Sequence, residues 1–190
     1  MYEVRFHGRG GQGAVMASAM LATALVAEGK YAVSIPAFGF ERRGAPVTSY
    51  LRCSDHPIRQ MTNIYQPDCI VCVDPTLTRS VDIFAGLKVG GTLVQASHQN
   101  LAELMIPASV ACVGLCNAVE IAMEIFNRPI TNTLMLGAFA RSTGVVSLAA
   151  LKKALEESEF RDAGLAQNLL ALERGYHETM VHNTLQRAAA

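Results

Sequence analysis

The chain has 190 residues, with 16 basic and 16 acidic side chains that cancel and a hydrophobic fraction of 51%. The balanced charge and the lack of a Lys/Arg-rich run argue against nucleic acid as a partner, and the apolar excess predicts surface that other chains cover. A chain of this length builds one well-buried core, so residues 1–186 are predicted to form a single domain and residues 187–190 a C-terminal tail.

The N-terminal part predicts a strand, a glycine turn and a helix. Residues 4–7 form the predicted strand and residues 14–28 the helix, which Gly29 closes as a C-terminal cap. This helix is apolar on nearly every side, so we expect it to lie between the sheet and another packed surface. Its apolar run, interrupted by Ser18 and Thr23, is shorter than the roughly 18 residues of a membrane span. Because residues 1–5 also lack the pattern of an export signal, we expect a cytoplasmic protein without a membrane partner.

The rest of the chain predicts more strands and then helices. The predicted strands are residues 31–35, 47–52, 69–73, 91–95 and 110–113. Helical patterns follow at residues 117–126 and 132–141. A further helix is predicted after an N-cap at Ser147, and a last one at residues 165–185, where apolar side chains recur as far as Met180. These elements predict an α/β fold, a three-layer, largely parallel, Rossmann-like sheet with flanking helices and C-terminal helices.

The five cysteines, an odd number without an export signal, fit reduced thiols better than a disulfide framework. Cys69 and Cys72 have the C-x-x-C spacing of a metal site, but a strand places residues three apart on opposite faces. Buried core thiols are therefore favoured over metal ligation, and the same interpretation is favoured for Cys112 and Cys116. No metal site is predicted.

A glycine-rich turn, G-x-G-x-x-G, lies between the first predicted strand and the first helix. Gly8, Gly10, Gly11 and Gly13 could let backbone N–H groups approach an anion at the helix N-terminus. The second predicted strand ends at residues 34–37 without the acidic residue that holds a ribose, so classical NAD binding is disfavoured. Binding of another phosphate or carboxylate, and a purely structural turn, both remain open.

Two motifs together resemble the gamma subunit, or gamma domain, of the pyruvate and 2-oxoacid:ferredoxin oxidoreductases. The turn at residues 8–13 reads G-R-G-G-Q-G, and residues 41–47 read E-R-R-G-A-P-V. Residues 132–138, N-T-L-M-L-G-A, are similar to a third segment of the family, so the resemblance extends to about residue 159.

The resemblance implies a subunit of a complex that oxidatively decarboxylates a 2-oxoacid to its acyl-CoA, with coenzyme A as co-substrate. It further implies that the partners are alpha, beta and ferredoxin-like delta subunits, which hold thiamine pyrophosphate with magnesium and iron–sulfur clusters. The electron acceptor that it implies is ferredoxin or an NAD-linked flavin subunit. The sequence agrees with this division, because it contains no G-D-G motif and no ferredoxin-type cysteine run. We therefore expect no catalytic residue and no cofactor in this chain, and no activity of the isolated chain.

The E-R-R-G-A-P-V form is closer to the pyruvate and branched-chain branch than to the 2-oxoglutarate branch. The family commonly has proline before the glutamate, whereas this chain has Phe40. An aromatic side chain there could suit a bulkier aromatic 2-oxoacid such as phenylglyoxylate, although burial against a partner would explain it equally well.

Several polar residues are candidates for contacts to substrate or coenzyme A. Arg42 and Arg43, beside Glu41, could bind a carboxylate or coenzyme A phosphates, or could form an ion-paired contact between subunits. Arg9 and Gln12 could face the same site or only fix the turn.

Other polar residues are expected to have structural roles. Asp74, which follows a strand, is favoured as a turn or capping residue, and His7 and His98 as structural. Two rival functions also remain, a stand-alone dinucleotide-dependent reductase and an assembly scaffold that binds nothing.

Overall fold

The computed structural model describes residues 1–37, 43–158 and 164–184. Seven strands of these ranges form one sheet in the order β2-β3-β1-β4-β5-β6-β7. Their bounds are β1 Tyr2–Arg9, β2 Tyr31–Pro36, β3 Pro46–Ser54, β4 Cys69–Cys72, β5 Gly91–Ala96, β6 Val110–Cys116 and β7 Met180–Asn183. The central strands β1, β4, β5 and β6 are parallel, whereas β3 is antiparallel to both β1 and β2, and β7 is antiparallel to β6. The predicted α/β fold with a largely parallel sheet is confirmed.

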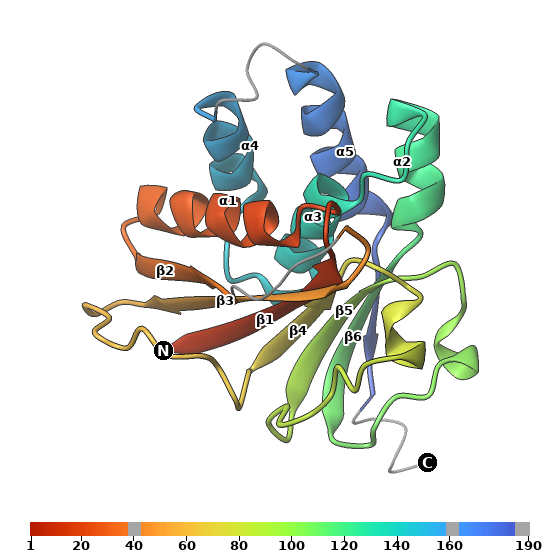
Figure 1. The fold of residues 1–190 in the computed structure, drawn as a ribbon. Coiled ribbons are helices and arrows are strands. Elements are labelled where there is room, and N and C mark those ends of the chain that lie inside the picture. The colour runs from red at the N-terminus through yellow and green to blue at the C-terminus, as the bar shows by residue number, and fades with distance from the viewer. Residues whose placement is uncertain (38–42, 159–163, 185–190) are drawn as a thin grey trace.

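The helices all lie on one face of this sheet (Figure 1). Their bounds are α1 Ala14–Ala27, α2 Ala118–Phe126, α3 Asn132–Thr143, α4 Leu148–Glu156 and α5 Leu165–Glu178. The other face is covered by loops and by two short 3₁₀ helices, η1 Leu77–Arg79 and η2 Leu101–Glu103. The flanking helices are thus as expected, while the third layer consists of irregular segments because the connections after β4 and β5 are not α-helical.

Strand β4 shows how the two faces are separated. Cys69 and Val71 belong to the apolar cluster beneath the helices, whereas Ile70 and Cys72 belong to the cluster on the opposite face. All four side chains are fully buried, as expected for a strand covered on both faces. The interpretation of Cys69 and Cys72 as core thiols is confirmed, and burial raises the pKa of Cys72 to about 12.

Helix α1 packs on β1, β2 and β3 and against α3 and α4, so its apolar character on most sides is explained by burial between the sheet and other helices. The predicted N-cap Ser147 is also confirmed, since its hydroxyl accepts a hydrogen bond from the Ala150 N–H at 3.1 Å.

The predicted helix at residues 165–185 is wrong at its C-terminal end. Helix α5 ends at Glu178, Thr179 is extended, and Met180 begins strand β7, which pairs with the outer side of β6. The hydroxyl of Thr179 donates back to the Gly175 carbonyl at 2.5 Å, which helps to end the helix. Pairing with β6 satisfies backbone groups of both strands, and this long-range gain overrides the local helical spacing that included Met180.

Two further observations concern the described ranges. No helix there is both long and apolar enough to cross a bilayer. Within the same ranges, no cluster of three His, Cys, Asp or Glu side chains is arranged to hold a metal ion.

Candidate functional site

The glycine turn connects the end of β1 to the start of α1. Gly11 and Gly13 have φ angles of 94° and 76°, a left-handed conformation that strains any residue with a side chain. Gly8 is required for close packing, because a Cβ there would lie 2.8 Å from Val73 Cγ2 and 3.0 Å from Ala14 Cβ. Gly13 is the N-cap of α1, so the first-turn N–H groups of this helix have no carbonyl one turn earlier. The predicted strand–turn–helix unit is confirmed.

The structure brings the two sequence motifs into direct contact. The Gly10 N–H donates to the Ala45 carbonyl at 2.9 Å, and the Gly44 N–H donates to the Gly10 carbonyl at 3.1 Å. Arg9 Nη1 donates to the Gly44 carbonyl at 3.1 Å. The side chain of Arg43 also lies against the turn, since its Cγ is 4.0 Å from the position of a Cβ on Gly11. Arg43 and Gly44 therefore form part of one wall of the site.

Three of the sequence-based predictions lie outside the described residues. These are the site candidates Glu41 and Arg42 and the C-terminal tail from residue 187. The same holds for Phe40, on which the suggestion of an aromatic substrate was based.

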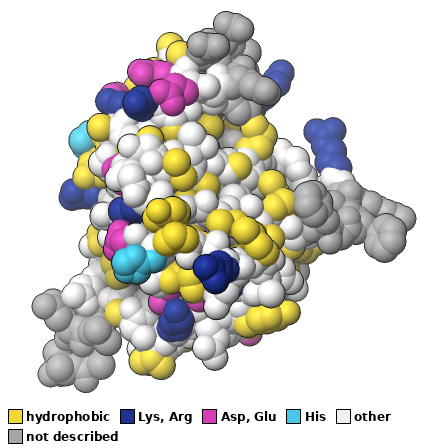
Figure 2. All heavy atoms as spheres, turned by 90° about the vertical axis from the view of Figure 1, so that its left-hand side faces the viewer, with side chains coloured by type: hydrophobic (Ala, Val, Ile, Leu, Met, Phe, Trp, Pro, Cys, Tyr) yellow, Lys and Arg dark blue, Asp and Glu magenta, His cyan; other side chains and the backbone are white. Residues whose placement is uncertain are grey.

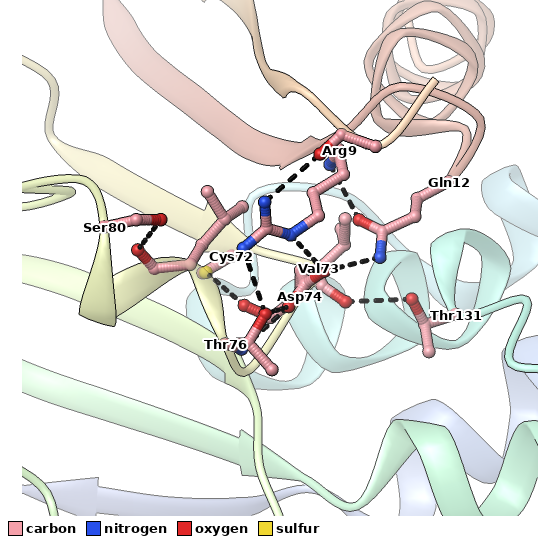
Figure 3. Close-up of polar contacts among 10 residues, drawn as sticks. Arg9, Gln12, Cys72, Val73, Asp74, Thr76, Ser80 and Thr131 are labelled. Atoms are coloured by element: carbon pink, nitrogen blue, oxygen red, sulfur yellow. Dashed lines mark hydrogen bonds and ion pairs between the residues drawn. The ribbon is translucent and has the colours of Figure 1, made fainter. Parts of the chain in front are cut away.

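Asp74 fixes the turn from the end of β4 (Figure 3). Its Oδ2 accepts hydrogen bonds from Gln12 Nε2 at 2.6 Å and Arg9 Nε at 3.2 Å. Its Oδ1 accepts from the Thr76 N–H at 2.7 Å and the Thr76 hydroxyl at 2.6 Å, which confirms the predicted turn role. We call this set of contacts the Asp74 latch. Sequence reasoning missed its link to the turn, because the partners lie 62 and 65 residues apart.

The latch keeps Asp74 ionised. Burial alone would raise the pKa of this carboxyl, but hydrogen bonds from Thr76 and Gln12 and the nearby charge of Arg9 lower it below its usual value. Gln12 is held on both sides, because its Oε1 accepts from the Arg9 N–H at 2.7 Å while its amide donates to Asp74.

A cleft of about 1320 Å³ opens beside the turn. The charged residues that line it, within the described ranges, are Arg9, Arg43 and Arg128, and no carboxylate is among them. It is also lined by residues at the N-terminal ends of α1, α3 and α5, which carry partial positive charge. Apolar side chains also line the cleft: Val15, Met16, Met20, Val47, Phe126, Ile130 and Leu155. The arrangement can hold an anionic group attached to a less polar body.

The order of the strands does not fit dinucleotide binding. In the Rossmann arrangement the second strand lies next to the first, so that an acidic residue at its end can reach the ribose. Here β3 lies between β1 and β2. Glu28, the nearest acidic residue before β2, instead accepts a hydrogen bond from the Ser147 N–H at 2.8 Å.

His7 and His98 are both separate from the cleft. His7 is buried, and its Nε2 accepts a hydrogen bond from Arg5 Nε at 3.0 Å. Burial and the charge of Arg5 lower the pKa of His7 to about 4, so it is neutral and structural at neutral pH, as predicted. His98 is exposed and is not among the lining residues.

Comparisons with known proteins agree with the resemblance in the motifs. The family model described as pyruvate ferredoxin/flavodoxin oxidoreductase matches residues 3–178. The chain is 76% identical, over the full length of both proteins, to the gamma subunit of NADH-dependent phenylglyoxylate dehydrogenase from Aromatoleum evansii. It is 45% identical to the common gamma subunit of the pyruvate/ketoisovalerate oxidoreductases of Thermococcus kodakarensis, covering 96% of this chain and 99% of that one.

A solved structure supports the same assignment. The pyruvate oxidoreductase subunit PORC from Thermotoga maritima superposes with a TM-score of 0.83 at 35% identity, covering 96% of this chain and 98% of that one. Fold, motifs and sequence similarity therefore agree along nearly the whole chain. The protein belongs to the pyruvate ferredoxin/flavodoxin oxidoreductase family, as a gamma-type subunit of a 2-oxoacid oxidoreductase.

Proposed function

We propose that this gamma subunit serves a complex that oxidises an aromatic 2-oxoacid of the phenylglyoxylate type. In the overall reaction the 2-oxoacid and coenzyme A give the acyl-CoA, carbon dioxide, a proton and two electrons. The substrate class is supported by 76% identity over all 190 residues to the phenylglyoxylate dehydrogenase gamma subunit, which is described as NADH-dependent. Of the two acceptors that the family resemblance implies, this name favours an NAD-linked flavin subunit over ferredoxin.

The cofactors of this reaction are assigned to partner chains. The sequence has no G-D-G motif for the magnesium of thiamine pyrophosphate and no ferredoxin-type cysteine run. The cysteines it does have do not fit a cluster, since Cys69 and Cys72 lie on opposite faces of the sheet. Thiamine pyrophosphate with magnesium and the iron–sulfur clusters accordingly belong to the alpha, beta and delta subunits of a cytoplasmic complex.

The role of this chain is to bind an anionic group of coenzyme A or of the 2-oxoacid at the glycine turn. The observation that carries this proposal is the cleft itself, which combines the start of α1 with Arg43 and has no carboxylate among its described lining residues. Phosphate and carboxylate share the same recognition chemistry, backbone N–H groups and a guanidinium fork. Kinetics with each substrate varied separately distinguishes them.

A different surface suits contact with a neighbouring subunit. Among the strands of the described ranges, β2 lies at the edge of the sheet and pairs with β3 alone, and its residues 31–36 carry no charge. Tyr31 of this strand and Val26 of α1 are 48% and 55% exposed, and they line a hollow with Val33, Pro57 and Ile58. Hydrophobic side chains gather on the face of the molecule that includes this edge (Figure 2). Uncovered, an uncharged edge strand would favour aggregation.

The test of the anion site is the Arg43→Ala variant in the reconstituted complex. Loss of a charge-assisted contact of about 1.5 kcal/mol raises the KM for the bound substrate roughly tenfold, with kcat nearly unchanged. Arg59→Ala is the matched control, because Arg59 is exposed and lies outside the cleft lining. The KM that rises identifies coenzyme A or phenylglyoxylate as the ligand of the site.

Two outcomes would contradict this proposal. An intact Arg43→Ala complex with both KM values within twofold of wild type would remove the binding role. Loss of assembly without any kinetic change in the residual complex would favour a scaffold. The reductase alternative is tested by titrating the purified subunit with NADH and NADPH, for which we expect no stoichiometric binding, because β3 occupies the place of the ribose-binding strand.

A further inference from the structure

We propose that Asp74 is a positioning residue, whose carboxylate sets Arg9 and Gln12 and, through Arg9, holds the Arg43 loop against the glycine turn. The inference rests on the proposed anion site. It assigns a function to a residue that does not line the cleft. Asp74 therefore acts through its partners and not by contact with the ligand.

The two carboxylate oxygens serve two different structures. Among the described residues, Oδ1 accepts two hydrogen bonds from Thr76 and so shapes the turn that follows β4. Oδ2 accepts two hydrogen bonds from the glycine turn, one from Gln12 and one from Arg9. Only a carboxylate can accept on both sides, because an amide presents one oxygen and one NH₂ group.

Arg9 passes this constraint on to the second motif. Its guanidinium donates to Asp74 through Nε, to the Thr76 hydroxyl through Nη2 at 3.2 Å and to the Gly44 carbonyl through Nη1 at 3.1 Å. These contacts connect the end of β4, the glycine turn and the residues just before β3, Arg43 and Gly44. Since Arg43 precedes Gly44 directly, the latch sets where its side chain can lie beside Gly11.

Burial and charge explain why the latch does not oppose an anion. The side chain of Asp74 is only 7% exposed, and that of Arg9 is 28% exposed. Each neutralises the other, so the carboxylate presents little net charge to the cleft. Among the described residues these contacts use three of the five guanidinium N–H groups of Arg9, which is also a lining residue of the cleft.

The test is Asp74→Asn in the reconstituted complex, with Asp82→Asn as control. The substituted amide must present its NH₂ group either to the donors of Thr76 or to those of Gln12 and Arg9, so one set loses its acceptor. Asp82 also caps a turn, accepting from the Phe84 N–H at 3.0 Å, but it is exposed and outside the latch. We expect Asp74→Asn to raise the same KM as Arg43→Ala, by about tenfold, with kcat within about twofold. Asp82→Asn should leave both constants unchanged.

A conservative variant separates positioning from general damage. Asp74→Glu keeps a carboxylate at position 74, which can still accept on both sides, and adds no charge to the cleft lining. We expect its KM to stay within about threefold of wild type. A merely steric role of position 74 would instead be disturbed more by the longer Asp74→Glu than by the isosteric Asp74→Asn.

The outcomes distinguish the latch from the site that it serves. A raised KM in Arg43→Ala together with an unchanged KM in Asp74→Asn would overturn the latch and leave the proposed function standing. Unchanged KM values in both variants would overturn the proposed function. If Asp74→Asn does not assemble, Thr76→Ala decides, because it keeps the carboxylate but removes one donor to Oδ1 and one acceptor of Arg9. A KM raised about threefold supports the latch, and an unchanged KM contradicts it.

Discussion

Alanine substitutions at the two ends of α1 measure how tightly the glycine turn is built. Gly13 at the N-cap and Gly29 beyond the C-terminal end have nearly the same left-handed conformation, with φ angles of 76° and 81°. Either substitution forces an L-residue into this region at a cost of about 1–2 kcal/mol. The energetic cost of the left-handed backbone conformation is therefore nearly the same in the two variants.

The surroundings of the added Cβ differ. At Gly29 no atom lies within 4 Å, whereas at Gly13 the Cβ would lie 2.6 Å from Asn132 Nδ2 and 3.2 Å from Asn132 Cγ. Asn132 is the first residue of α3, so relieving this overlap displaces a cleft residue and adds about 1–2 kcal/mol. We expect Gly29→Ala to destabilise the subunit by about 1 kcal/mol and Gly13→Ala by about 3 kcal/mol.

Urea unfolding of each purified variant, followed by circular dichroism, gives the difference in free energy of unfolding when the m-values agree. The kinetic consequence follows in the reconstituted complex, where Gly13→Ala should raise the KM that depends on Arg43 and Gly29→Ala should not. Equal destabilisation by the two substitutions would refute the close approach of the turn to α3.

Three more predictions concern the core and the thiols. The pKa of buried His7, about 4, lies below the usual 6.5, so the free energy of unfolding falls by about 3 kcal/mol in total as the pH drops from 6.5 towards 4. In urea titrations, His7→Gln should abolish this part of the pH dependence. The Arg52 side chain is 3% exposed and donates from Nε to Glu3 Oε1 at 2.9 Å. Arg52→Met should therefore lower the free energy of unfolding by about 3 kcal/mol and lower the Tm. A change below about 0.5 kcal/mol would show that the ion pair is dispensable. Cys112 is the one cysteine that is not fully buried, so iodoacetamide should label it first in the native subunit, as peptide mass spectrometry would show.

The sequence predicted the elements that depend on local pattern. The apolar run of β4 and the cap at Ser147 are both where the pattern places them. The glycine turn was predictable, because G-x-G-x-x-G between a strand and a helix is typical of such a turn, and the positive φ angles of Gly11 and Gly13 are a local reason for glycine.

Features that depend on long-range pairing were not predictable. Met180 fits the helical spacing of α5, yet it lies in β7 because β6 offers it a partner strand. The insertion of β3 between β1 and β2 is likewise invisible in the periodicity of either strand. Asp74 was predictable as a turn residue from Asp74-Pro75, but its contact with Gln12 arises only when β1 and β4 become neighbours.

The cleft beside Gly11 and Arg43 is proposed to receive an anionic group of substrate or coenzyme A in the assembled enzyme. A structure of the complex at near-atomic resolution with coenzyme A and phenylglyoxylate bound would show the ligand of this cleft. We expect a phosphate or carboxylate within hydrogen-bond distance of the N–H groups at the start of α1 and of the Arg43 guanidinium. A cleft filled by polypeptide of a neighbouring subunit, with both ligands bound elsewhere, would contradict it.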